Sequence, residues 1–139
     1  MARVDFYILS DVDEASRQSY LCRVADKAAR KGLRVWIHAT ESAAALDERL
    51  WSFSQGSFVP HELAADGFDP ECPVLIGDGE PADECQVLIN DNDEIPPFAA
   101  RFERIAEVVG GEPGGRRRAR ERFRQYRDQG HEMHHHEVD

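Results

Sequence analysis

The sequence lacks the features that mark secreted and membrane proteins. Its three cysteines, Cys22, Cys72 and Cys85, include no CxxC pair, so we expect neither a disulfide framework nor a cysteine-based zinc site. No apolar run approaches the roughly 18 residues that a membrane-spanning helix needs. The first residues, MARVDF, contain an early acid and lead into no long apolar stretch, unlike a signal peptide. We therefore expect a cytoplasmic protein with reduced thiols and no membrane contact.

Motifs of nucleotide-dependent enzymes are missing as well. The chain contains neither GxGxxG nor GxxxxGK[ST]. The loop at 10–14, SDVDE, has no glycine and three acids, so it would repel a phosphate group. The stretch GGEPGG at 110–115 follows an expected helix, not a strand, and we interpret it as a linker. The sequence thus gives no support for an enzymatic activity or for a bound cofactor.

Basic residues are scarce overall but concentrated in one segment. The chain has 17 Lys and Arg against 27 Asp and Glu, a formal net charge of −10, which disfavours nucleic-acid binding by the chain as a whole. Residues 116–127, RRRARERFRQYR, nevertheless contain seven arginines and one glutamate, a local charge of +6. Such asymmetry points to a local anionic partner.

Alternating strand and helix patterns predict an α/β fold. Residues 4–9, VDFYIL, and 33–39, LRVWIHA, favour strands because they are rich in β-forming side chains. The segment between them shows apolar residues at helical spacing, with Asp11 and Asp13 as candidate caps and Gly32 as the expected end. This rhythm is typical of a mostly parallel central sheet flanked by helices.

The rest of the chain is expected to complete one domain, residues 1–130. A second helix would start at Thr40, and short strands would follow at 74–76 and 86–89 after an irregular stretch. Another helix is predicted from Pro96, because several apolar residues would share one of its faces: Phe98, Phe102, Ile105, Ala106 and Val109. The basic segment forms the last predicted helix, at about 116–128.

Two clusters could suggest a metal site. His131 and His135 would share a face if the C-terminal segment were helical, with His134 and His136 nearby. We instead interpret residues 131–139 as a flexible, solvated tail. The acidic group at 91–94 lacks the spacing and the central glycine of a calcium-binding EF-hand loop. No metal site is therefore expected.

The first candidate binding surface is an aromatic cluster at the end of the second expected helix and in the loop after it. Large aromatic residues are preferred anchors of protein interfaces, and loops lie at the surface. The same residues could instead close one end of the sheet core, and the sequence leaves both readings open. The cluster consists of Trp51, Phe53, Phe58, Val59 and Pro60.

The second candidate surface is the basic helix. Arg116, Arg120, Arg124 and Arg127 would form one stripe, with Phe123 beside them. An aromatic ring framed by guanidinium groups could hold an apolar side chain while the arginines bind carboxylates. The partner would be an acidic peptide with an aromatic or aliphatic end, or nucleic-acid backbone. A third interpretation is that the helix is solvated and its arginines pair with acidic residues of the same chain.

Several motifs together resemble the chi subunits of bacterial DNA polymerase III. The most distinctive is LDERLW at 46–51 followed by SFVPH at 57–61. Other matching segments follow in the same order along nearly the whole chain: VDFYIL at 4–9, PVLI at 73–76, VLIN at 87–90, PPF at 96–98, FERIAEVV at 102–109 and RERFRQYR at 120–127.

The resemblance implies a Rossmann-like, helicase-related fold without a phosphate loop, in a non-catalytic adaptor of the DNA-directed DNA polymerase at the replisome. One surface would bind the psi subunit of the clamp loader, through positions matching Trp51, Phe58 and Pro60, with replication or repair helicases as competitors. The other would bind the acidic C-terminal tail of single-stranded-DNA-binding protein, so that contact with nucleic acid is mainly indirect. The positions matching this pocket are Val109, Arg116, Arg120, Phe123, Arg124 and Arg127.

Two departures from the family pattern bear on the second surface. Position 123 is Phe where Tyr is common, so a hydroxyl contact would be lost. The segment DNDEIPPF at 91–98 itself resembles the acidic tail of the partner. We interpret this segment as a helix start and not as an internal copy of the ligand.

Overall fold

Parallel strands form the frame of the structure. The computed structural model describes residues 1–54, 56, 59–69 and 71–138, and within them seven strands make one all-parallel sheet in the order β3-β4-β2-β5-β6-β1-β7. The elements are β1 (Arg3–Leu9), α1 (Glu14–Arg30), β2 (Val35–His38), α2 (Ala43–Ser52), β3 (His61–Leu63), η1 (Ala64–Asp66), β4 (Val74–Gly77), β5 (Val87–Asn90), η2 (Ala99–Arg101), β6 (Arg104–Val109), α3 (Pro113–Asp128) and β7 (Glu132–Val138).

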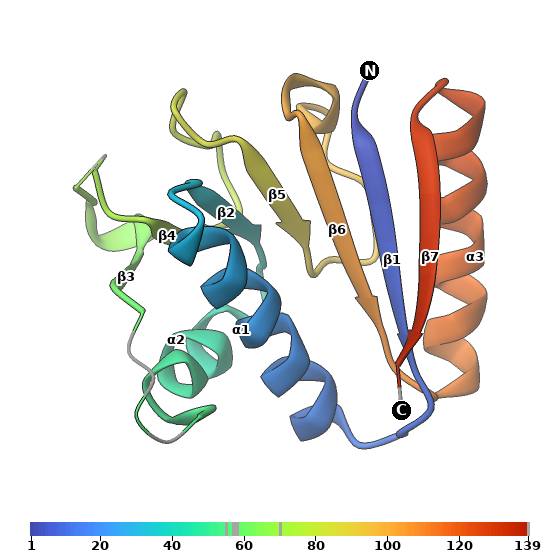
Figure 1. The fold of residues 1–139 in the computed structure, drawn as a ribbon, viewed down its shortest axis with the longest axis horizontal. Helices are drawn as coiled ribbons and strands as arrows, with labels where there is room; N and C mark the ends of the chain where they lie inside the picture. Colours follow the sequence, from blue (N-terminus) through green and yellow to red (C-terminus); the bar gives the residue numbers. More distant parts are fainter. Residues whose placement is uncertain (55, 57–58, 70, 139) are drawn as a thin grey trace.

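The sheet separates two apolar cores. Helices α1 and α2 cover one face, and α3 lies against the other, beside β7 (Figure 1). In β2, Val35 and Ile37 belong to the first core while Trp36 belongs to the second. A strand buried on both faces is expected in a parallel sheet covered by helices. This arrangement confirms the predicted Rossmann-like α/β class.

The predicted strands at 4–9, 33–39, 74–76 and 86–89 are confirmed as β1, β2, β4 and β5, with small shifts of their ends. The first helix also begins and ends as predicted. The side chain of Asp13 accepts a hydrogen bond from the Ala15 amide, and Gly32 follows the helix with φ of 83°.

The predicted helix from Pro96 is wrong. Residues 96–98 lie in a loop, and Ala99–Arg101 forms a short 3₁₀ turn. Arg104–Val109 is strand β6, which lies between β5 and β1 in the sheet. The apolar residues fit helical spacing by coincidence, because a strand buried on both faces has no two-residue alternation to reveal it. The predicted helix start at 91–98 is wrong as well, because this segment forms no helix or strand.

The predicted linker at 110–115 is also wrong in its second half. Pro113 occupies the first turn of α3, and Glu112 caps that turn by accepting hydrogen bonds from the amides of Gly114 and Gly115. Proline is favoured at this position because the first turn needs no amide donor from it. The two glycines therefore belong to the helix that follows.

The predicted flexible tail is replaced by a strand. Glu132–Val138 forms β7, which pairs with β1 in register from Arg3 and Glu132 to Leu9 and Val138. Histidine and glutamate are weak strand formers, but pairing with an otherwise open edge of β1 outweighs local preference. The short strand β3 was not foreseen, and α2 begins after Ser42, which makes no capping hydrogen bond, and not after Thr40 as predicted.

Candidate interaction surfaces

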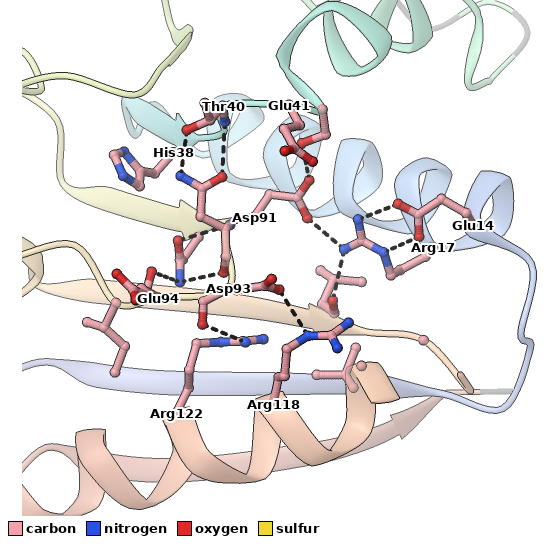
Figure 2. Close-up of a pocket in the computed structure, with 18 of the residues that line it drawn as sticks. Glu14, Arg17, His38, Thr40, Glu41, Asp91, Asp93, Glu94, Arg118 and Arg122 are labelled. Atoms are coloured by element: carbon pink, nitrogen blue, oxygen red, sulfur yellow. Dashed lines mark hydrogen bonds and ion pairs between the residues drawn. The ribbon is translucent and has the colours of Figure 1, made fainter. Parts of the chain in front are cut away.

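A large open cavity lies at the carboxyl ends of the central strands, where α/β sheets usually bind their ligands. It has a volume of about 680 Å³, and Figure 2 shows side chains of several elements converging on it. Its ionisable lining has seven carboxylates against three arginines: Asp13, Glu14, Glu41, Asp91, Asp93, Glu94 and Glu112 against Arg17, Arg118 and Arg122. A polyphosphate would meet net negative charge here.

The central arginine of this cavity is already neutralised. Arg17 donates to Asp91 at 2.6 Å and to Glu14 at 2.7 Å (Figure 2). Burial alone would lower the pKa of Arg17, but these carboxylates raise it above its ordinary value. The lining thus compensates its own cations, which agrees with the missing phosphate loop. Among the residues that the structure describes, no group of three or more His, Cys, Asp or Glu could hold a metal ion.

Next to this cavity, a buried carboxylate anchors α3 to the sheet. Glu107 of β6 is 1% exposed. Its two oxygens accept hydrogen bonds from Arg122 at 3.0 Å, Tyr126 at 2.8 Å and Asn90 at 2.9 Å. Burial raises the pKa of Glu107 above its usual value, although all three donors favour the carboxylate. This network has no local signature in the sequence, because its members come from three elements: β5, β6 and α3.

Helix α3 therefore has two different arginine flanks. The buried residues Ala119 and Tyr126 mark the side that faces the sheet. We call Arg118 and Arg122 the inner flank, because both reach Asp93, which follows β5 (Figure 2). At 100° per residue, the opposite side carries the remaining candidates. This outer flank consists of Arg116, Arg120, Phe123, Arg124 and Arg127.

The chain's own acidic segment lies against the inner flank. Asp93 accepts from Arg118 at 3.2 Å through its carboxylate and from Arg122 at 3.1 Å through its backbone carbonyl. Ile95 and Phe98 then pack into the second core. The segment at 91–98 is thus part of the fold, held to the inner flank by Asp93 and in the second core by Ile95 and Phe98.

The arginines of the outer flank are mostly exposed. Arg124 pairs with Glu121 and Arg127 with Asp128, and all four side chains are 58–71% exposed. Surface pairs of this kind contribute about 0–1 kcal/mol and are easily exchanged for another partner. Arg120 is exposed as well. Arg120, Arg124 and Arg127 are thus available to an anionic ligand without loss of a buried interaction.

The other three predicted pocket residues are less exposed than these arginines: Arg116, Phe123 and Val109. Arg116 is half-buried and donates to the backbone carbonyls of Leu9 and Gly110. Phe123 is half-buried, with its ring 5.2 Å from that of Phe6. Val109 lies in the second core beneath α3. The predicted pocket residues are therefore brought together only in part: Phe123 and the four arginines lie on the outer flank, whereas Val109 lines the cavity on the side of Arg118 and Arg122.

The aromatic cluster divides between core and surface. Trp51, at the end of α2, is 59% exposed, and Pro60 is exposed as well. Val59 is 1% exposed and Phe53 packs against the first core. Phe58 lies outside the described residues. Phe53 and Val59 thus help to close the core, whereas Trp51 and Pro60 are exposed, as a binding surface would require.

His61, which the sequence reading had not singled out, holds this cluster in place. One ring nitrogen lies 2.6 Å from the Val59 carbonyl oxygen and the other lies 2.9 Å from that of Asp47 in α2. Its ring meets that of Trp51 edge-on at 4.9 Å. The loop is thereby fixed to the helix, and the indole is held at the surface. The motif SFVPH at 57–61, which contains His61, was the feature of the sequence that could have identified this residue.

The two candidate surfaces lie far apart on the molecule. Helix α2 sits on one face, near the β3 and β4 end of the sheet, and α3 sits on the other face beside β7 (Figure 1). Two partners could therefore bind without meeting. A helix able to span a bilayer is absent from the part of the chain that the structure describes, and the three cysteines are free thiols.

Comparison with known proteins gives consistent matches. A family model described as DNA polymerase III chi subunit, HolC, matches residues 1–134. A protein named DNA polymerase III subunit chi from Pseudomonas aeruginosa is 43% identical over 141 residues, covering 99% of this chain and 98% of its own. Proteins of the same name from Haemophilus influenzae and Escherichia coli are each 33% identical, covering 90% and 91% of this chain and 90% and 92% of their own.

Proposed function

Because the chain belongs to the DNA polymerase III chi subunit family, we propose that it is a non-catalytic accessory subunit of the replicative polymerase that bridges two replication proteins. The observation that supports bridging most directly is the separation of two exposed surfaces with different chemistry (Figure 1). One presents an aromatic ring and proline, and the other presents arginines.

The aromatic surface would bind the psi subunit of the clamp loader. Trp51 is the natural anchor, because a large exposed ring that is held rigidly loses little entropy on binding. Pro60 would extend the same surface, Phe58 is included because its position in the family motif serves this partner, and Phe53 and Val59 would support the surface from the core. A repair helicase with a similar binding segment would compete for it.

The outer flank of α3 would bind the acidic C-terminal tail of single-stranded-DNA-binding protein. Arg120, Arg124 and Arg127 would pair with carboxylates, and Phe123 would contact the apolar end of the tail. Each contact would be weak alone. Joined in one chain, they raise each other's effective concentration, so the clamp loader stays at coated template.

The first test is fluorescence anisotropy with a short acidic peptide that ends in Ile-Pro-Phe and a free carboxylate. Arg124→Ala should weaken binding by about three- to tenfold, the loss of one charge-assisted contact. Arg118→Ala is the matched control, since Arg118 lies on the same helix but on the inner flank. Equal losses in the two variants, or no binding of the peptide, would contradict the assignment.

The aromatic surface has its own test. Trp51→Ala should abolish capture of the psi subunit in a pull-down while leaving peptide binding to the outer flank unchanged. Arg124→Ala should give the reverse pattern. Loss of both interactions in either variant would argue against two independent surfaces.

Direct binding of single-stranded nucleic acid is the alternative, and the exposed arginines of the outer flank favour it. A titration with labelled single-stranded DNA alone separates the two. A nucleic-acid interface would show affinity that falls steeply with salt, whereas the adaptor should bind the peptide in salt that abolishes binding to DNA.

A further inference from the structure

Strand β7 leaves one side of its backbone open. Within the described residues, β7 is the last strand of the sheet and pairs with β1 on its inner side. Natural edge strands are usually protected by charged side chains, above all lysine, by proline or by a bulge. The register of β7 runs without interruption, and its sequence, EMHHHEV, has no lysine or proline; its two charged residues, Glu132 and Glu137, lie at or near its ends. This edge is thus suited to accept another strand.

Two hydrogen bonds identify which backbone groups point outward. The Glu132 amide donates to the Ala2 carbonyl, and the Val138 carbonyl accepts from the Ser10 amide. Both residues therefore direct their backbone toward β1. Because backbone groups alternate along a strand, the amides and carbonyls of Met133, His135 and Glu137 point away from β1, toward the open edge.

The same three residues place their side chains on the face that α3 covers. Met133 packs against the second core with Phe6, and successive side chains alternate between faces. His134 and His136 lie on the opposite face, where His136 donates to Asp5 at 2.8 Å. A strand added beside β7 would therefore turn every second side chain toward α3.

The outer flank of α3 is the part of the helix nearest this edge. Figure 1 shows α3 running along β7. The inner flank contacts Glu107 of β6 and Asp93 after β5, on the far side from β7. Phe123 meets Phe6, whose neighbour in β7 is His135. The outer arginines thus lie on the side of α3 nearest the free edge of β7.

The spacing of these arginines fits an extended acidic chain. Residues four apart on a helix, such as Arg120 and Arg124, are about 6 Å apart along its axis. Alternate residues of a strand are about 6.7 Å apart. Carboxylates at alternate positions of a strand on β7 would therefore meet successive arginines, and the positive flank selects an acidic peptide over a basic or apolar one.

Given the proposed function, we propose that the acidic tail binds as an added β-strand along the outer edge of β7, with its alternate acidic side chains paired to the outer flank of α3. Backbone hydrogen bonds would supply affinity, and the arginines would supply specificity. The partner is defined by this chemistry: an extended, acidic peptide whose backbone amides are free over the segment that pairs.

The test is a series of labelled acidic peptides ending in Ile-Pro-Phe, each with one backbone amide N-methylated. Methylation removes a donor and blocks close approach of the strands. Strand addition predicts an alternating pattern: about tenfold weaker binding at every second position and less than about twofold change at the positions between. A flat profile, with the unmodified peptide still bound and still dependent on Arg124, overturns strand addition but leaves the proposed function intact.

A pair of variants tests the protein side. His135→Pro removes an outward amide and should weaken peptide binding about tenfold, while His135→Ala keeps the amide and should bind normally. Circular dichroism verifies that both are folded, and the peptide series on the unaltered chain decides the matter if the proline variant is not.

Two further outcomes count against the inference. No binding of the unmodified peptide overturns both this inference and the proposed function. Sedimentation of the free chain provides the remaining check. A dimer that His135→Pro dissociates would assign the β7 edge to a second copy of the chain and not to the peptide.

Discussion

The two flanks of α3 place the same residue type in opposite environments. On the inner flank, Arg122 is 11% exposed and pairs with the buried Glu107. On the outer flank, Arg124 and its partner Glu121 are both 60% exposed. The Arg122–Glu107 pair lies in a low-dielectric environment and fixes the helix to the sheet. The second is screened by water and can be exchanged for a ligand.

This difference shows that the function of an arginine is decided by its partner and its burial, and not by its place in a basic run. One helix therefore carries a buried anchor, Arg122, and an exposed arginine, Arg124, only two residues apart, and the exposed one is the residue proposed to bind a ligand. Stability and binding should separate cleanly when each flank is altered alone.

The largest effect is expected from breaking the inner flank. Arg122→Ala leaves Glu107 buried without its cation and should lower the free energy of unfolding by about 3 kcal/mol. Arg120→Ala, the matched change on the outer flank, should stay within about 0.5 kcal/mol. Urea denaturation followed by circular dichroism measures both.

Replacing the whole inner pair provides the control. The double variant Glu107→Leu, Arg122→Met has no buried charge, so it should recover most of the loss. If Arg122→Ala were as stable as the unaltered chain, Glu107 would not depend on its arginine and the contrast between the flanks would fail.

A smaller effect is expected from the hydroxyl group that shares the inner carboxylate. Tyr126→Phe removes the 2.8 Å hydrogen bond to Glu107 and should cost about 1–2 kcal/mol of stability. Phe123→Tyr, which adds a hydroxyl on the outer flank, should be nearly neutral. Thermal unfolding compares the two, and equal shifts would show that the flanks are not distinct.

Acid pH should weaken the pairing of β7 with β1. Burial raises the pKa of Asp5, but hydrogen bonds from Arg3 and His136 bring it below its ordinary value of 3.8. A lowered pKa means that the contribution of Asp5 to stability is present above 3.8 and is lost as the pH falls through the lower folded value.

Asp5→Asn should therefore cost about 1 kcal/mol at neutral pH, and the difference from the unaltered chain should shrink below about pH 4. Denaturation curves at several pH values measure this. A difference that stays constant into acid would mean that the charge of Asp5 does not stabilise the β1–β7 pair.

The smallest change in stability is expected for Arg124→Ala. Its exposed pair with Glu121 is a surface pair, so the free energy of unfolding should change by less than about 0.5 kcal/mol, although peptide binding falls. A loss of stability as large as that of Arg122→Ala would place Arg124 in the fold and not in the binding surface.

The sequence predicted those elements whose local pattern and tertiary setting agree. Asp13 and Gly32 bound α1 through local chemistry, and β1, β2, β4 and β5 are rich in β-forming residues. Strand β6 was missed because it is buried on both faces, and β7 because its pairing with β1 is a contact across the whole length of the chain.

The candidate surfaces were predicted as groups of residues, but not in their geometry. Composition placed Trp51 and Val59 in one cluster, although only burial distinguishes the exposed ring from the core valine. The arginine stripe was visible at helical spacing. Its division into two flanks depends on Glu107 and Asp93, which lie 15 and 25 residues from their arginines and have no local signature.

The position of β1 between β6 and β7 has a consequence for how the protein is made. The first strand to leave the ribosome must wait for the last two before either of its neighbours exists. At about 5–20 residues per second, β1 stays without its sheet partners for several seconds of synthesis. A nascent chain that stops before residue 132 would leave one side of β1 exposed, so premature termination should favour aggregation or degradation over a partly working subunit.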